Sequence, residues 1–195
     1  MLTPSKLTPP KRRYFTYAVP AALCLTLISV PAHADTPDHE AAKFASGPGN
    51  IIYLAAGIGL PLLSDGRYGT RHALRVADAL GTSVLLAEAS KSLVREKRPD
   101  SDAHDSFPSG HATAAFAVAT LESDLHPHQA ALWYLGATLI SLSRIRLRRH
   151  TTGDVVAGAV LGAGTARVEV NQPCGLILSP FIMRGGLGMI MTHGL

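Results

Sequence analysis

Three short clusters between residues 91 and 154 hold the side chains of this sequence that are best suited to chemistry. Lys91, Arg98 and Arg144 supply cations, and an arginine fork suits a tetrahedral oxyanion while a lysine adds a point charge. Ser109 supplies a hydroxyl group, and Gly110 lets its backbone N–H approach a ligand closely. Together these residue types predict a cradle for a tetrahedral anion.

Two histidines and a carboxylate accompany the cations. His150 lies four residues before Asp154, so on a helix the two side chains would share one face. A carboxylate there would hold the imidazole in one tautomer and stabilise its charged form. His111 follows a turn of small residues, where a helix N-terminus can present N–H groups to an anion. A cradle with a nucleophile, an orienting group and a general acid predicts phosphoryl transfer.

Each cluster also has a simpler interpretation. Lys91 and Arg98 could be solvated charges two turns apart on one helix, and the arginines between residues 144 and 149 could form a solvated basic face. Ser109 could merely cap a helix at a turn. The presence of all three clusters, in order and with their internal spacings intact, favours the functional interpretation.

The clusters read Lys91-x6-Arg98-Pro99, Pro108-Ser109-Gly110-His111 and Ser143-Arg144-x5-His150-x3-Asp154. They resemble the tripartite signature of the type 2 phosphatidic acid phosphatase (PAP2) superfamily, and every signature position matches over about 64 residues. The resemblance implies an all-α fold, a helical bundle. It also implies a phosphatase reaction that needs no metal and no other cofactor.

The resemblance implies a role for each matched residue. His150 would attack phosphorus and form a phosphohistidine, Asp154 would orient His150, and His111 would protonate the leaving group. The residues that would hold the phosphoryl oxygens are Lys91, Arg98, Ser109, Gly110 and Arg144. Many members carry glycine before the nucleophilic histidine and proline after it, where this chain has Arg149 and Thr151. This departure bears on substrate preference.

Residues 1–34 have the parts of a secretory signal peptide. Four basic residues precede an apolar stretch from about Tyr14 to Val30, and Ala32-His33-Ala34 fits a cleavage site. We therefore expect residues 35–195 to form a phosphatase domain in the periplasm, soluble, associated with the inner membrane or embedded in it. An uncleaved transmembrane anchor is the alternative interpretation of the N-terminal stretch.

Removal of residues 1–34 changes the charge balance. The whole chain has 18 basic and 14 acidic residues, and four basic but no acidic residues lie in 1–34, which leaves 14 of each. A neutral mature chain gives no support for nucleic-acid binding. Only Cys174 would remain after cleavage, which excludes an intrachain disulfide and a cysteine–histidine metal site.

Helices must position the three clusters, and apolar periodicity predicts where they lie. The predicted helices span residues 51–63, 70–98, 110–124, 127–148 and 154–168. Residues 35–49 are predicted to be a polar lead-in, with Asn50 as the first N-cap. Two apolar segments, 176–183 and 187–191, predict a short C-terminal β-hairpin.

Three patterns predict how these helices pack. The 13-residue run 51–63 is short for a bilayer span, which needs about 20 residues, and predicts a buried core helix. In 70–98 the residues expected to face the core are Leu74, Ala77, Leu80, Val84, Ala87 and Leu93. Gly158 and Gly162 have the spacing of a close helix contact, which would help seat His150.

The expected partners are phosphorylated small molecules or lipid phosphates and pyrophosphates, and a membrane surface whose anionic headgroups the arginines near His150 could contact. A vanadium-dependent haloperoxidase, which shares the oxyanion site, is one alternative, although the short chain argues against it. A phosphate- or lipid-binding relative without catalysis is another, and the intact His111, His150 and Asp154 argue against that. The sequence leaves the oligomeric state open.

Overall fold

The computed structural model describes residues 37–172 and 175–176. Its α-helices are α2 (Pro37–Ser46), α3 (Pro48–Ser64), α4 (Gly69–Val94), α5 (Gly110–Leu125), α6 (Ala130–Arg146) and α7 (Thr152–Asn171). Two short 3-10 helices, η1 (Gly66–Tyr68) and η2 (Pro127–Gln129), precede α4 and α6. No strand occurs within these described residues, which confirms the predicted all-α class. The predicted signal peptide and nearly all of the predicted hairpin lie outside them.

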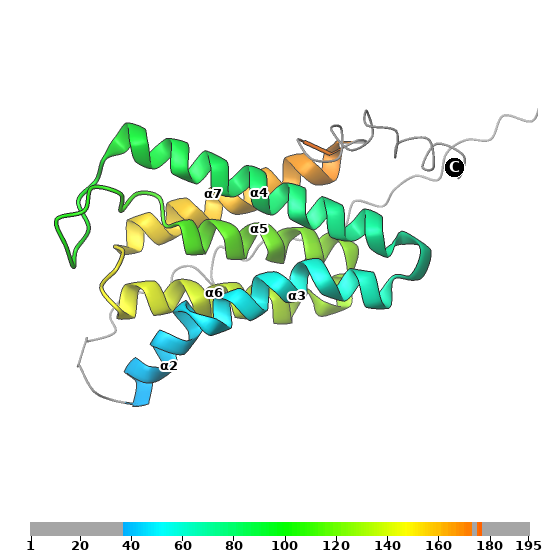
Figure 1. Cartoon of the computed structure of the whole chain (residues 1–195), viewed down its shortest axis with the longest axis horizontal. Coiled ribbons are helices and arrows are strands. Elements are labelled where there is room, and N and C mark those ends of the chain that lie inside the picture. The colour runs from blue at the N-terminus through cyan, green and yellow to red at the C-terminus, as the bar shows by residue number, and fades with distance from the viewer. Residues whose placement is uncertain (1–36, 173–174, 177–195) are drawn as a thin grey trace, which may run out of the picture.

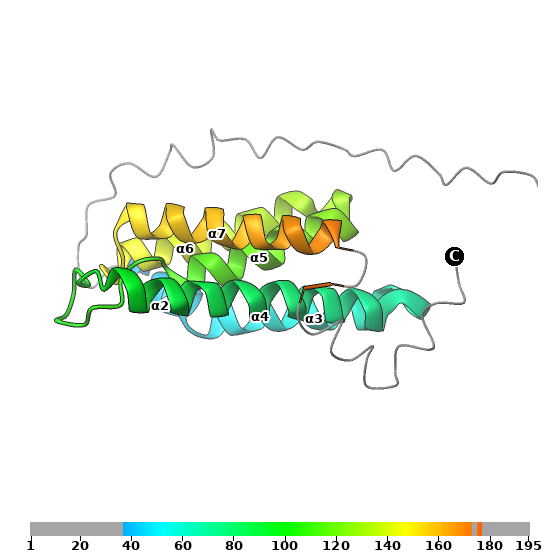
Figure 2. The ribbon, with the colours of Figure 1, turned by 90° about the horizontal axis from the view of Figure 1, so that it is seen from above.

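Helices α3 to α7 lie side by side, each running antiparallel to the one before it, so the bundle has two distinct ends (Figures 1 and 2). Helix α5 is central and packs against α3, α4, α6 and α7. It can do so because alanine fills five of its eleven buried positions, including Ala112, Ala115 and Ala119. Small side chains let neighbouring helix backbones approach closely on several sides at once.

The contact between α5 and α7 is made through glycine. A Cβ atom added to Gly158 would lie 2.5 Å from the carbonyl oxygen of Ser109, and one added to Gly162 would overlap the backbone of Thr113. The predicted close approach at these two glycines is therefore confirmed. It brings the start of α7 directly against the start of α5, where Ser109 lies.

Two predicted helix boundaries are wrong. The supposed polar lead-in, 35–49, contains α2 and the first residues of α3, whose N-cap is Gly47 rather than Asn50. Helix α4 ends at Val94 because Arg95 adopts a left-handed conformation with φ of 50°. Arg98 therefore lies in the loop after α4 and not on the same helix as Lys91.

The apolar residues of α3 and α4 follow the prediction only in part. In α3 only Gly57 and Pro61 are buried, while Leu63 is 84% exposed. In α4 the predicted core residue Ala87 is buried, and Leu80 is partly buried against the core, but Leu93 is exposed. Some larger apolar side chains of these helices, such as Leu54, Ile58 and Leu80, are partly buried against the core, whereas others lie on the outer surface.

The described helices were compared with the length and apolar composition that a bilayer span requires. No single helix within 37–172 meets both requirements. The segments Asp38–Ser46 and Pro48–Ser64, which meet at a bend of 41°, do so only as a pair.

Candidate active site

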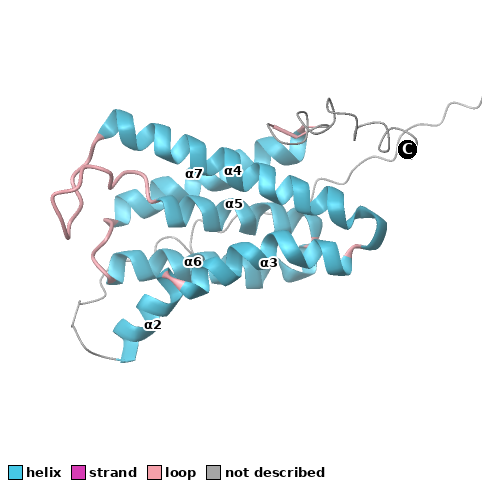
Figure 3. Ribbon diagram, viewed as in Figure 1, coloured by secondary structure: helices cyan, strands magenta, loops and turns pink. Residues whose placement is uncertain are grey.

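The predicted site residues all lie at one end of the bundle, where α4 and α6 end and α5 and α7 begin. Figure 3 shows the two loops of this end, one after α4 and one between α6 and α7. In chain order the residues that the structure brings to this end are Lys91, Arg98, Ser109, Gly110, His111, Arg144, His150 and Asp154. Residues up to 63 positions apart in the sequence thus come together at the ends of four helices and in the loops that adjoin them.

The start of α5 is tied to the start of α7. Ser109 is the N-cap residue of α5, and its backbone N–H donates to the carbonyl oxygen of Asp154 at 2.9 Å. Its hydroxyl group is fully buried and has no hydrogen-bond partner. A Cβ added to Gly110 would lie 3.4 Å from Nζ of Lys91, which is an ordinary contact distance. The lysine ammonium group therefore lies at the N-terminus of α5.

His150 and Asp154 meet through a helix cap. Thr151 is the N-cap of α7, and its side chain and the Asp154 carboxylate form a capping box. Oδ2 of Asp154 accepts from the Thr151 amide at 2.8 Å and from the Ser106 hydroxyl at 2.6 Å. Nδ1 of His150 lies 3.6 Å from the same oxygen, and both side chains are buried. His150 thus lies between α6 and α7, as the predicted helix bounds implied, and it does not share a helix face with Asp154.

Arg98 is already engaged by a carboxylate from its own loop. Its Nε and Nη2 donate to the two oxygens of Asp105 at 2.7 and 2.9 Å. Hydrogen bonding to the guanidinium, followed by its charge, holds the pKa of Asp105 below its usual value. The Asp105 side chain is 46% exposed, but its carboxylate lies where an oxyanion would bind the arginine fork.

Ser46, the last residue of α2, completes the site and was not found from the sequence. Its carbonyl oxygen accepts a hydrogen bond from Nε2 of His111 at 3.1 Å, and its hydroxyl accepts from Nη1 of Arg144. Because a carbonyl oxygen can only accept, Nε2 of His111 carries a proton in this arrangement. The one sequence signal near Ser46 is Pro48, a residue typical of the first turn of a helix.

The buried cations and histidines lower each other's affinity for protons. Burial, followed by the charge of Arg144, lowers the pKa of His111 to about 4. The pKa of His150 is also lowered, first by burial and then by Arg144 and Arg98, although Asp154 opposes this. Burial lowers the pKa of Arg144 itself to about 10. The site therefore holds two neutral histidines among cations when no anion is bound.

Four polar atoms of the site are buried without a hydrogen-bond partner. They are Ser109 Oγ, Arg144 Nε, His150 Nδ1 and Asp154 Oδ1. Leaving such a group unpaired costs about 1–3 kcal/mol. An anion with several acceptor oxygens would satisfy the donors on Ser109 and Arg144. The arrangement therefore suits a bound tetrahedral oxyanion better than an empty site.

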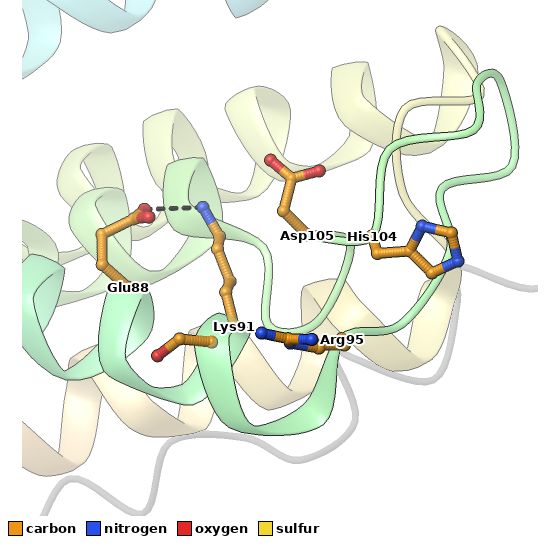
Figure 4. Close-up of a pocket in the computed structure, with 6 residues that line it drawn as sticks. Glu88, Lys91, Arg95, His104 and Asp105 are labelled. Atoms are coloured by element: carbon orange, nitrogen blue, oxygen red, sulfur yellow. Dashed lines mark hydrogen bonds and ion pairs between the residues drawn. The ribbon is translucent and has the colours of Figure 1, made fainter.

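An open pocket of about 540 Å³ adjoins the cradle beside Lys91. Figure 4 shows Lys91 paired with Glu88, whose Oε1 lies 2.6 Å from Nζ, and Asp105 on the loop opposite. The other residues that line this pocket are Ser92, Arg95 and His104. The side chains that line the pocket are polar or charged, and the pocket leaves room for a leaving group next to the phosphate.

Comparisons with known proteins bear on the whole arrangement. A family model described as the PAP2 superfamily matches residues 72–173, which is just over half of the chain. A "Lipid A 1-phosphatase" from Porphyromonas gingivalis is 38% identical over 93 residues, a match that covers 45% of this chain and 21% of that protein. The chain thus spans only about a fifth of that relative. No solved structure matches it. The match to the family model confirms the resemblance predicted from the three clusters, and the chain belongs to the PAP2 superfamily.

Proposed function

We propose that this chain is a phosphatase that hydrolyses phosphate esters or pyrophosphates of lipids through a phosphohistidine intermediate. The observation that carries the proposal is the group of buried, unpartnered polar atoms contributed by Ser109, Arg144, His150 and Asp154. A transferable phosphoryl group would satisfy the two donors and leave His150 and Asp154 to pair with each other. A lipid substrate is supported by the similarity to a lipid A 1-phosphatase.

His150 is the nucleophile in this proposal. Its Nδ1 faces Asp154, so Nε2 is the nitrogen that attacks phosphorus. The bond from phosphorus to the leaving oxygen breaks as the bond from phosphorus to nitrogen forms. Water then attacks the phosphohistidine, which releases inorganic phosphate and restores the imidazole. The 3.6 Å separation from Asp154 shortens to a hydrogen bond when the imidazole gains charge, as catalytic contacts often do.

His111 gives a proton to the leaving oxygen and later accepts one from the attacking water. Its low pKa in the free protein means that it arrives neutral. A phosphate group beside it offsets the charge of Arg144 and raises its affinity for a proton. The proton then comes from a substrate monoanion or from water. This coupling makes protonation of the acid depend on the presence of substrate.

The charge of the transferring group is stabilised by Lys91, Arg98 and Arg144 together with the start of α5. These side chains supply the positive charge that metal ions supply in other phosphatases, so we propose that the reaction needs no metal. Arg98 offers its fork to the phosphate only when Asp105 gives it up. Asp105 therefore acts as an internal competitor for the substrate.

Association with a membrane is part of the proposal. The outer faces of several helices carry exposed apolar side chains, among them Ile51, Leu63, Leu85, Leu86, Leu132, Leu135, Leu139 and Val160. Contact with lipid would remove this apolar surface from water. Lipid substrates reside at the same surface. We further propose that residues 1–34 direct the domain 35–195 to the periplasm.

The test is phosphate release by the purified chain with EDTA in the reaction, using an aryl phosphate, phosphatidate and a polyprenyl pyrophosphate, each with and without detergent. We expect release from the lipids and a phosphohistidine that is stable to alkali and labile to acid. His150→Ala should remove both. Full activity in His150→Ala would refute the assignment of the nucleophile. Release that requires added divalent metal would refute the proposed metal independence.

A further inference from the structure

A second cluster of ionisable side chains lies at the opposite end of the bundle from the phosphate cradle. Asp65 follows α3, His72 is in the first turn of α4, and His126 follows α5. The 16 residues of α5 separate this end from Ser109 by about 24 Å. In Figure 1 the turn between α3 and α4 lies at the right end, and the loop after α4 lies at the left. The cluster is therefore independent of the catalytic proposal.

Three ligand-type atoms converge in this cluster. Nδ1 of His72 lies 2.6 Å from Oδ2 of Asp65, and Nε2 of His126 lies 3.0 and 3.1 Å from the two Asp65 oxygens. The three groups each offer an atom within 4.8 Å of the others. The side chains are shielded, with exposed fractions of 9% for Asp65, 26% for His72 and 16% for His126. Such shielding separates this cluster from ordinary surface charges.

Glu122 fixes the orientation of the His126 ring through Nδ1, the nitrogen that does not face Asp65. Its Oε2 lies 2.8 Å from Nδ1 of His126, and the glutamate is almost completely buried. A carboxylate in this position holds the proton on Nδ1 and leaves the lone pair of Nε2 pointing the other way. That lone pair then faces the carboxylate of Asp65. Two electron-rich atoms about 3 Å apart repel one another unless a proton or a metal ion lies between them.

We propose that Asp65, His72 and His126 bind a divalent transition metal ion, with Glu122 orienting His126. Two imidazole nitrogens and one carboxylate oxygen form a donor set typical of zinc, with a fourth position left for water. Ligand atoms in a tetrahedral zinc site stand roughly 3.3 Å apart, so shifts of less than about 1 Å would seat the ion. The ion would fasten the α3–α4 turn to the end of α5.

The first experiment measures metal binding by the purified, untagged full chain. After removal of metal, titration with Zn²⁺ against a chromogenic chelator should show one tight equivalent. Co²⁺ should give the intense visible bands of a four-coordinate site, and X-ray absorption of the zinc form should show two imidazole ligands. Absence of stoichiometric binding, or fewer than two imidazoles, would overturn the proposal even without any variant.

Variants locate the ion. The double variant His72→Ala/His126→Ala should lose at least 100-fold in zinc affinity, and Glu122→Gln should lose about 10- to 100-fold. His128→Ala is the matched control, because its exposed ring lies 6.3 Å from that of His126 but contacts no carboxylate of the cluster. Zinc bound by the folded double variant as tightly as by the unaltered chain would overturn the assignment.

A stability measurement separates this site from the catalytic one. Removal of the metal should lower the melting temperature of the full chain by several degrees. Phosphate release, assayed well below both melting temperatures, should persist. A melting temperature that zinc does not change would contradict the role as a fastener. Loss of phosphate release in His150→Ala with zinc binding intact would show that the two sites are separate.

Discussion

Nδ1 of His150 lies 3.6 Å from Oδ2 of Asp154, an oxygen that is already bonded to Ser106 and to the amide of Thr151. The carboxylate is thus fixed by a helix cap before it meets the histidine. One residue serves both the start of α7 and the proposed nucleophile. Loss of Asp154 should therefore affect stability and catalysis together, whereas loss of Ser106 should affect mainly the position of the carboxylate.

We expect Asp154→Asn to lower kcat about 100-fold, because an amide cannot stabilise the charge that develops on His150. Removal of the capping carboxylate should also lower the free energy of unfolding by roughly 1 kcal/mol. Initial rates and urea unfolding would measure the two effects separately. Ser106→Ala should cause a smaller loss of rate. An unchanged kcat in Asp154→Asn would mean that another group holds His150.

In the proposed function, Asp105 and an oxyanion compete for the guanidinium of Arg98. Asp105→Asn should free the fork of Arg98, so inorganic phosphate and vanadate should inhibit the variant several-fold more tightly than the unaltered chain. Inhibition constants measured against an aryl phosphate would test this. The control is Asp102→Asn, since Asp102 pairs with the exposed Lys97. Weaker inhibition of Asp105→Asn would instead mean that Asp105 positions Arg98 for binding.

The α5–α7 contact allows a matched test of packing. Gly162→Ala should destabilise the fold by at least about 1–3 kcal/mol, because its Cβ would overlap the backbone of Thr113. Gly164→Ala changes the same helix at a position where a Cβ meets nothing within 4 Å. That variant should stabilise α7 by roughly 0.5–1 kcal/mol. Equal effects of the two substitutions, measured by urea unfolding, would contradict the packing described.

The three clusters of the proposed site could be found from the sequence because they match a family signature of fixed residue types at fixed local spacings. The residues that contact these clusters from other parts of the chain could not be predicted from the sequence. Ser46 lies in α2, 98 residues before the arginine that it contacts, and Asp105 resembles any other loop acid until the fold places it on Arg98.

The arrangement of the helices explains why two further features were not predicted correctly from the sequence. Apolar periodicity predicted a core stripe on α4 that is right for Ala87 and includes Leu93, but Leu93 lies in the last turn of the helix and is exposed. The second cluster was also missed, because Asp65, His72 and His126 share no local spacing. Only the antiparallel arrangement of α3, α4 and α5 brings them together.

The lowered pKa of His111 makes stability depend on pH with a definite sign. Its pKa is about 4 in the folded protein against 6.5 in the unfolded chain, so between these values the unfolded chain binds more protons. The free energy of unfolding should therefore fall as the pH drops from about 6.5 to 4 and should lose no more from this group below that range.

His111→Gln removes the titrating ring and keeps an amide that can donate to Ser46. Between pH 7 and pH 4.5 the unaltered chain should lose roughly 2 kcal/mol more than this variant. Urea unfolding of both proteins at several pH values, in one mild detergent, would measure the difference. His150, whose pKa is also lowered, titrates in both proteins, so the difference between the two curves reports the titration of His111 together with its coupling to His150. Parallel stability curves would mean that His111 is not held neutral by burial beside Arg144, and the proposed protonation on substrate binding would lose its basis.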